Sequence, residues 1–195
     1  MYNRLRKLIE DRCLITNTDI TLSIGEKSSF YFDCKKITLD GEGLDLLAAA
    51  FLDRIDELPQ PPQAIGGLTM GADFIVAAVA MKAFQLGRQP AVGSIVRKEP
   101  KKHGTRNYIE NQLDAGTTIV VVDDVITSGK STAQACEQFH DAGYEIVGIV
   151  ALVDREQGGA DTLRERFQVP VLSVFKRSDF PKLAKTYGQA PAVVA

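Results

Sequence analysis

From Ala64 onward, short apolar runs of strand length alternate with longer segments of helical pattern. The runs "AIGG", "PAVGSIV", "TTIVVVD", "YEIVGIVALVD" and "PVLSVF" are apolar at consecutive positions over most of their length. Strands that are apolar on both faces need cover on both sides, which helices provide in a parallel sheet. We therefore predict a doubly wound α/β fold, in which a Rossmann-like parallel sheet is flanked by helices.

Residues 1–60 follow a different pattern. Leu5, Leu8 and Ile9 recur at helical spacing, and Asp40 stands where a helix cap is expected. The expected elements are a helix over 2–12, strands over 20–23 and 30–34, and a helix over 40–58. A chain of 195 residues with 45% hydrophobic content suits one core. We expect a single domain over 1–195, with 1–60 forming a small N-terminal hood on an α/β core over 61–195.

The overall charge gives no sign of a polyanionic partner. The formal net charge is -2, and the longest apolar stretches are too short to span a bilayer. The three cysteines have neither metal-ligand nor redox spacing, which suits a reducing compartment. We expect a cytoplasmic protein that binds neither nucleic acid nor membrane.

The stretch "TTIVVVDDVITSGKST" (117–132) predicts a phosphate site at the end of a buried strand. Its last letters resemble an ATP-binding Walker loop, but Asp124 stands where that loop requires its first glycine. The turn still offers hydroxyls, a lysine and the free N–H groups of a helix start. Asp123 and Asp124 repel phosphate and suit sugar hydroxyls or a metal. Together these features predict a ribose 5-phosphate site, in preference to an ordinary turn capped by Asp124 or Ser128.

On these residues the stretch resembles the binding motif of the type I phosphoribosyltransferases. The resemblance implies that the acidic pair holds the 2- and 3-hydroxyls of phosphoribosyl pyrophosphate (PRPP) and that the turn holds its 5-phosphate. The residues of this stretch that it implies for PRPP binding are Asp123, Asp124, Val125, Ile126, Thr127, Ser128, Gly129, Lys130 and Ser131.

A basic loop precedes this strand. The segment "VRKEPKKHGTRNYIE" resembles the catalytic loop of orotate phosphoribosyltransferases, Arg-Lys-Glu-x-Lys-x-His-Gly, at every specified position: Arg97, Lys98, Glu99, Lys101, His103 and Gly104. The resemblance implies Lys101 and His103 as catalytic residues, and adds Arg97 and Lys98 to the PRPP contacts. It also implies a homodimer, in which the 97–112 loop completes the site of the neighbouring subunit.

Three further segments resemble the same family. "KSSFYFDCKKITLDGEGL" is similar to its substrate-covering region, "GGLTMGAD" to its pyrophosphate loop, and "LVDRE" to the strand end whose arginine binds orotate. The orotate contacts expected here are Thr127, Arg155, Tyr31 and Phe32. Met70 and Ser23 stand where some members have lysine, so we expect no cationic contact from either.

The resemblance implies transfer of ribose 5-phosphate from PRPP to orotate, with Mg²⁺ held mainly through PRPP. Asp123 and Asp124 are the candidates for any direct metal contact. Two alternatives remain at this stage. One is a phosphoribosyltransferase for another base, although a purine has no carboxylate to pair with Arg155. The other is a non-enzymatic regulator that senses PRPP.

Overall fold

The computed structural model describes residues 1–21, 27–99 and 108–186. At its centre is a six-stranded sheet with the strand order β5-β4-β3-β6-β7-β8. Its members are β3 (Ala64–Leu68), β4 (Val92–Val96), β5 (Ile109–Glu110), β6 (Thr118–Ile126), β7 (Glu145–Asp154) and β8 (Val171–Lys176). All neighbouring strands run parallel except β4 and β5. The predicted α/β fold with a mainly parallel sheet is confirmed.

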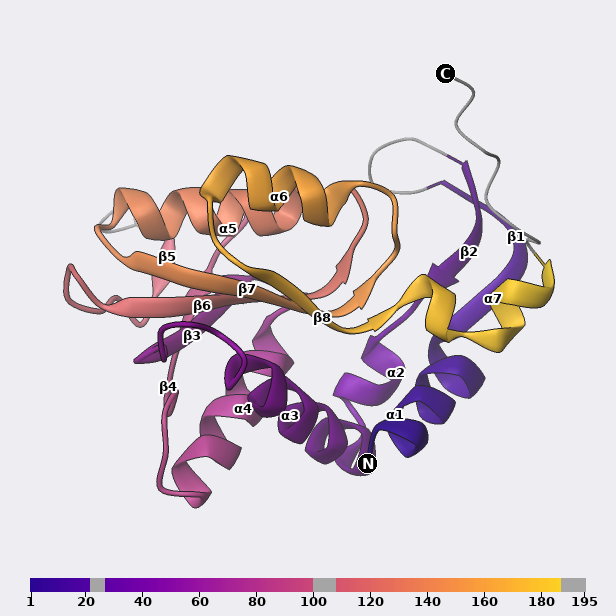
Figure 1. Ribbon diagram of the computed structural model, residues 1–195, viewed down its shortest axis with the longest axis horizontal. Helices are drawn as coiled ribbons and strands as arrows, with labels where there is room; N and C mark the ends of the chain where they lie inside the picture. Colours follow the sequence, from indigo (N-terminus) through magenta and orange to yellow (C-terminus); the bar gives the residue numbers. More distant parts are fainter. Residues whose placement is uncertain (22–26, 100–107, 187–195) are drawn as a thin grey trace.

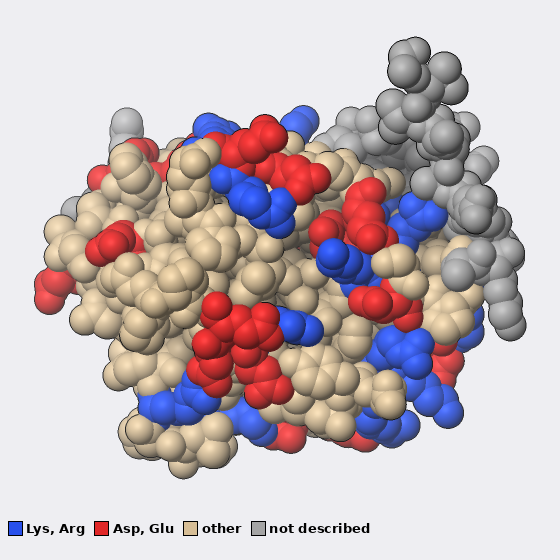
Figure 2. Space-filling view, in the orientation of Figure 1, with Lys and Arg blue, Asp and Glu red and all other residues tan. Residues whose placement is uncertain are grey.

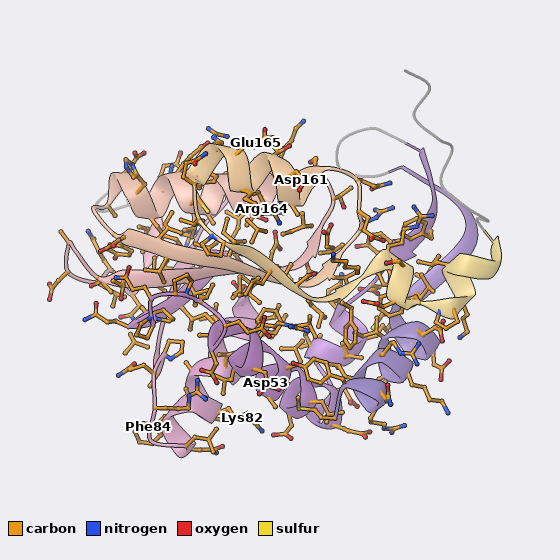
Figure 3. All side chains as sticks on the ribbon, in the orientation of Figure 1. Asp53, Lys82, Phe84, Asp161, Arg164 and Glu165 are labelled. Carbon is orange, nitrogen blue, oxygen red and sulfur yellow. The ribbon has the colours of Figure 1, made fainter. Side chains whose placement is uncertain are left out.

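Helices cover both faces of this sheet (Figure 1). One face packs against α3 (Gly41–Ile55) and α4 (Asp73–Gln85), and the other against α5 (Lys130–Asp141) and α6 (Gly159–Phe167). Figure 3 labels three charged side chains of α6, Asp161, Arg164 and Glu165, of which Arg164 donates to the Val171 oxygen at the start of β8 at 3.2 Å. No helix within the described ranges has both the length and the hydropathy needed to cross a bilayer.

The N-terminal elements gather at one end of the sheet, beside α7 (Pro181–Thr186) (Figure 1). They are α1 (Tyr2–Leu8), a π-helical turn (Ile9–Cys13), β1 (Leu14–Thr21), β2 (Lys27–Phe32) and α2 (Lys35–Thr38). Strands β1 and β2 form an antiparallel pair. Leu5, Phe32 and Ile37 belong to the same buried apolar cluster as Val150 and Phe175 of the central sheet. The N-terminal part is thus attached to the sheet by shared hydrophobic packing.

A chain of aromatic rings, the aromatic row, crosses this junction. Ring centroids lie 6.2 Å apart between Tyr2 and Phe175 and 5.8 Å apart between Phe175 and Phe180. The row continues from Phe180 to Phe32 at 5.1 Å and from Phe32 to Phe30 at 5.9 Å. Such spacings allow edge and tilted packing, which adds to the gain from burial. The row joins α1, the end of β8 and the hairpin strand β2.

Several boundaries differ from the prediction, among them those of helices α1 and α3 and of strand β2, and three of the differences bear on the hairpin, the phosphate turn and the sheet edge. Strand β1 begins at Leu14, six residues before the predicted start at Ile20, because hairpin pairing overrides the low strand propensity of a polar stretch. Strand β6 continues through Ile126, three residues beyond the end of the apolar run "TTIVVVD" at Asp123, and the turn from Thr127 follows it directly. The polar segment 97–116 contains the short antiparallel strand β5, which pairs with β4 at the sheet edge.

Candidate active site

A cavity of about 720 Å³ lies at the carboxyl ends of β6 and β7, the edge where parallel α/β sheets bind ligands. Its walls come from β2, the loop after β3, the end of β6 with the following turn, and the residue after β7. Most of the residues predicted for the site line it: Tyr31, Phe32, Lys98, Asp123, Asp124, Val125, Thr127, Ser128, Gly129, Lys130, Ser131 and Arg155.

Two predicted contacts stand apart from this cavity. Arg97 donates through Nη1 to Glu110 Oε1 at 2.9 Å and does not line the cavity. Ile126 is buried in the core, because alternate residues of a strand face opposite sides and Val125 takes the cavity side. Lys101 and His103 lie outside the described residues.

The acidic pair is nearly enclosed. The Asp123 side chain is held on both oxygens: Thr132 Oγ1 donates to Oδ2 at 2.7 Å, and the Asp124 N–H donates to Oδ1 at 3.0 Å. Asp124 Oδ1 accepts the Val125 N–H at 2.8 Å. Burial, followed by repulsion from Asp124, raises the pKa of Asp123 to about 7, and burial also raises the pKa of Asp124. The pair is therefore oriented to accept hydroxyl donors or a cation.

This elevated pKa gives the free protein a distinctive pH dependence. As pH rises from about 4 to about 7, we expect the Asp123 contribution to the free energy of unfolding to fall by a few kcal/mol. Over this range the folded state retains a proton that the unfolded state releases, so deprotonation favours unfolding. Urea unfolding at pH 5 and pH 7.5 measures the difference. The Asp123→Asn variant should show a smaller fall, and an identical fall in both proteins would contradict the assignment.

The turn after β6 presents backbone donors to the cavity. Gly129, the residue directly before α5, is in the left-handed conformation with φ of 77°, and no side chain caps this helix start. The alternative of an ordinary turn capped by Asp124 or Ser128 therefore does not apply. Without a side-chain cap, the N–H groups of the first helical turn can bind an anion. A Cβ atom on Gly159 would lie 2.3 Å from the Thr127 oxygen, so the start of α6 supports the turn at backbone contact.

The loop after β3, the segment compared above with a pyrophosphate loop, forms the opposite wall, although none of its residues was predicted individually as a contact. Thr69, Met70 and Gly71 line the cavity, and Thr69 Oγ1 donates to Asp73 Oδ2 at 2.7 Å. A Cβ atom on Gly71 would come within 2.9 Å of Asp124 Oδ1. The loop backbone thus lies directly against the acidic pair. The glycine-rich sequence "GGLTMGAD" was the available signal.

Lys35, Thr132 and Gln134 also line the cavity without having been predicted. Lys35 Nζ lies 2.8 Å from Asp33 Oδ1, an interaction that raises the pKa of Lys35, and its charge lowers the pKa of Asp124 in part. Gln134 Nε2 donates to the Lys98 oxygen at 3.4 Å and so connects α5 to the segment after β4. Thr132 lies in the first turn of α5, where its buried hydroxyl reaches back to Asp123.

Arg155 closes the far end of the cavity. Its guanidinium carbon lies 4.3 Å from the centroid of the Phe30 ring, and Nη2 donates to the Phe30 oxygen at 3.4 Å. The residue is only 2% exposed, and burial lowers the pKa of Arg155. A guanidinium stacked at the end of the aromatic row is positioned to bind a planar carboxylated ring.

The cavity therefore combines an anion-binding turn, a pair of carboxylates for hydroxyl groups, and a buried cation beside an aromatic wall. This combination suits a phosphorylated sugar at one end and a planar anion at the other. Covalent chemistry between the two ligands would occur where they meet, near the acidic pair and Thr127.

Comparisons with known proteins agree with this geometry. The family model described as "Phosphoribosyl transferase domain" matches residues 42–177. The chain is 38% identical over 178 residues to the orotate phosphoribosyltransferase of Aquifex aeolicus, covering 90% of this chain and 95% of that protein. Among solved structures, Mycobacterium tuberculosis orotate phosphoribosyltransferase in complex with Fe(III) dicitrate superposes with a TM-score of 0.76 at 28% identity, covering 91% of this chain and 97% of that one. The same enzyme in complex with PRPP gives a TM-score of 0.71 at 26% identity, with coverage of 91% and 97%.

Proposed function

The chain belongs to the phosphoribosyltransferase family, and within it to the orotate phosphoribosyltransferases, and from this membership we propose which residues bind each substrate and which act on the leaving group. The protein is a pentosyltransferase that transfers ribose 5-phosphate from PRPP to orotate. The products are orotidine 5'-monophosphate and pyrophosphate, in the pyrimidine pathway that leads to UMP. The proposed residue roles rest on one observation: the acidic pair, the anion-binding turn and Arg155 line the same cavity.

The donor occupies the β6 side of the cavity. The backbone and hydroxyls of Thr127, Ser128 and Ser131 hold the 5-phosphate at the start of α5. Asp123 and Asp124 accept hydrogen bonds from the ribose hydroxyls, and Thr132 keeps Asp123 in position. The Thr69–Gly71 loop receives the pyrophosphate mainly through its backbone, because Met70 carries no charge.

Orotate occupies the β7 side. Arg155 binds its carboxylate through the planar guanidinium fork, a geometry that lysine cannot reproduce. Tyr31 lines the base pocket directly. Phe32 is almost fully buried in the aromatic row and therefore supports the pocket chiefly from behind. Thr127 lies between the donor and base regions and can contact either ligand.

The anomeric carbon gains positive charge as pyrophosphate departs, and the carboxylates beneath the ribose favour that charge. We assign Lys101 and His103, which lie outside the described residues, to the departing pyrophosphate: the lysine as a point charge and the histidine as a proton donor. Lys98 lines the cavity and can reach the donor, whereas Arg97 would have to leave Glu110 to do so. Enclosure of the site excludes the water that would hydrolyse PRPP.

The donor set at this cavity fits Mg²⁺ held mainly through PRPP. Among the described residues no group of three or more metal-ligating side chains occurs, but two adjacent carboxylates face the donor position. Asp124, and less directly Asp123, would hold the ion or its water shell. When bound, Mg²⁺ would neutralise charge on the pyrophosphate.

Three broader assignments complete the proposal. Residues 1–195 form one domain, with 1–60 as its hood. Two copies form a homodimer in which the 97–112 loop of one subunit completes the site of the other. The enzyme works in the cytoplasm.

Two other functions are less well supported. A phosphoribosyltransferase for a purine would gain nothing from a buried arginine beside its base. A regulator that binds nucleic acid would need a basic surface, whereas acidic and basic side chains are interspersed on the face drawn in Figure 2.

The decisive experiment is an orotate depletion assay. With PRPP and Mg²⁺, we expect the protein to consume orotate, followed by its ultraviolet absorbance. Excess chelator should stop the reaction, and added Mg²⁺ should restore it. Consumption of adenine, hypoxanthine or uracil in place of orotate would contradict the substrate assignment but not the family.

A further inference from the structure

A second arginine stands beside Arg155 because of the register of the sheet. Strands β7 and β8 are parallel, and Asp154 at the end of β7 pairs with Lys176 at the end of β8. The next residue on each strand is an arginine, Arg155 on one and Arg177 on the other. Parallel neighbours in register bring such successive residues to the same edge of the sheet. The ligand-binding edge therefore carries two guanidinium groups at adjacent positions.

Both guanidinium groups lie over one aromatic ring. The guanidinium carbon of Arg155 lies 4.3 Å from the centroid of Phe30, and that of Arg177 lies 5.7 Å from it. The two cations are thus within about 10 Å, the Debye length at 0.1 M ionic strength, and are not fully screened from each other. The positive charge of Arg177 lowers the pKa of Arg155 further, after burial.

The backbone around Arg177 is held firmly. Glu156, which follows Arg155, accepts hydrogen bonds from the Ser178 N–H at 2.8 Å and the Ser178 hydroxyl at 3.1 Å. Asp179 Oδ2 accepts the Lys176 N–H at 2.7 Å. Phe180 is fully buried in the aromatic row. The backbone on both sides of Arg177 is therefore held by hydrogen bonds, and its guanidinium lies over the Phe30 ring.

We propose that Arg177 is a specificity-determining residue: it acts through Arg155 to make the base pocket favour a carboxylated pyrimidine over a neutral one of the same shape. Arg177 does not itself line the cavity, but its charge lies over the same ring as that of Arg155, so the two cations repel each other and an anion placed beside Arg155 interacts favourably with both. A neutral base gains little from the second charge. This inference rests on the proposed function, because it takes the orotate carboxylate as the partner of Arg155.

We expect the charge of Arg177 to change the binding of orotate and not the rate of the chemical step. The carboxylate of orotate is retained in the product, and its charge does not change as the glycosidic bond forms. An interaction that is equal in ground state and transition state changes KM and leaves kcat unaltered. PRPP binds at the other end of the cavity, so its KM should not change.

The test compares Arg177→Gln with the wild type at constant ionic strength. We expect KM for orotate to rise by about three- to tenfold, with kcat and KM for PRPP unchanged. Inhibition by orotamide, the neutral amide of orotate, should be the same in both proteins. Arg177→Lys retains the charge and should restore most of the affinity for orotate. Lys176→Gln, which removes the same charge from the neighbouring residue, is the matched control and should leave every constant unchanged.

Equal weakening of orotate and orotamide in Arg177→Gln would overturn the proposal and assign Arg177 a structural role. An unchanged KM for orotate would also overturn it. These results differ from failure of the proposed function, in which the wild type itself would not consume orotate.

Discussion

Replacing Arg155 by methionine should lower kcat/KM for orotate by about 100- to 1000-fold while the protein remains folded and binds PRPP normally. The loss is large because the orotate carboxylate would lose its cationic partner, a side chain that is buried at the end of the cavity. The free energy of unfolding should not fall. Burial disfavours the charged form of Arg155, as its lowered pKa shows, and methionine fills a similar volume without the cost of burying a charge. Steady-state kinetics with each substrate varied in turn, together with thermal unfolding, measures both effects.

Two companion variants sharpen this test. Arg155→Lys keeps the charge but loses the planar fork, and we expect it to recover only part of the activity. Mixing Arg155→Met with Lys101→Ala, each inactive alone, should restore activity if the two residues act in one site across a homodimer. Subunit exchange without any recovery would contradict the shared site, and equal losses for orotate and PRPP in Arg155→Met would contradict its assignment to the base.

Replacing Gly67 by alanine should destabilise the protein by about 3 kcal/mol, because a Cβ atom there would lie 2.3 Å from the Val122 oxygen and 2.5 Å from the Ala72 Cβ. For a chain of this size the melting temperature should fall by about 6 to 12 °C. Val122 precedes the acidic pair and Ala72 follows the Thr69–Gly71 loop, so separating them also displaces the two walls of the donor site. We expect KM for PRPP to rise at temperatures where the variant is still folded.

Gly41→Ala is the matched control. A Cβ atom on Gly41 meets nothing within 4 Å, and the residue opens α3 after the capping Asp40. The same chemical change should therefore be neutral or stabilising by up to about 1 kcal/mol. Calorimetry of the two variants beside the wild type separates steric overlap from a general effect of losing a glycine. Similar melting temperatures for both variants would contradict the steric argument.

The parts of the site that were predictable are encoded locally. An apolar strand, two aspartates, a turn of small residues and a helix start follow one another in "TTIVVVDDVITSGKST", so the donor site could be inferred from one continuous stretch. Arg155 was predicted from the resemblance of the short segment "LVDRE" to the strand end that carries the family's arginine. The parallel sheet followed from runs too apolar to face water on either side.

The missing parts depend on which segments meet in space. Gly71 touches Asp124 because β3 and β6 are neighbours, and Arg177 stands beside Arg155 because β7 and β8 are in register. No local pattern specifies either adjacency. Ile126 was included because the resemblance covers the whole stretch from Asp123 to Ser131, whereas strand β6 extends through this residue and its alternation buries the side chain.

The aromatic row has a consequence for how the enzyme matures during synthesis. The donor half of the site, from β3 to α5, is built from one stretch of chain and leaves the ribosome as a unit. The base half needs Phe30, Arg155 and Phe180, and the hydrogen bond between Arg155 and Phe30 joins residues 125 positions apart. Contacts of such long separation form late. A nascent chain halted before β8 would lack Phe175 and Phe180, and with them the packing behind Phe32 and the base pocket.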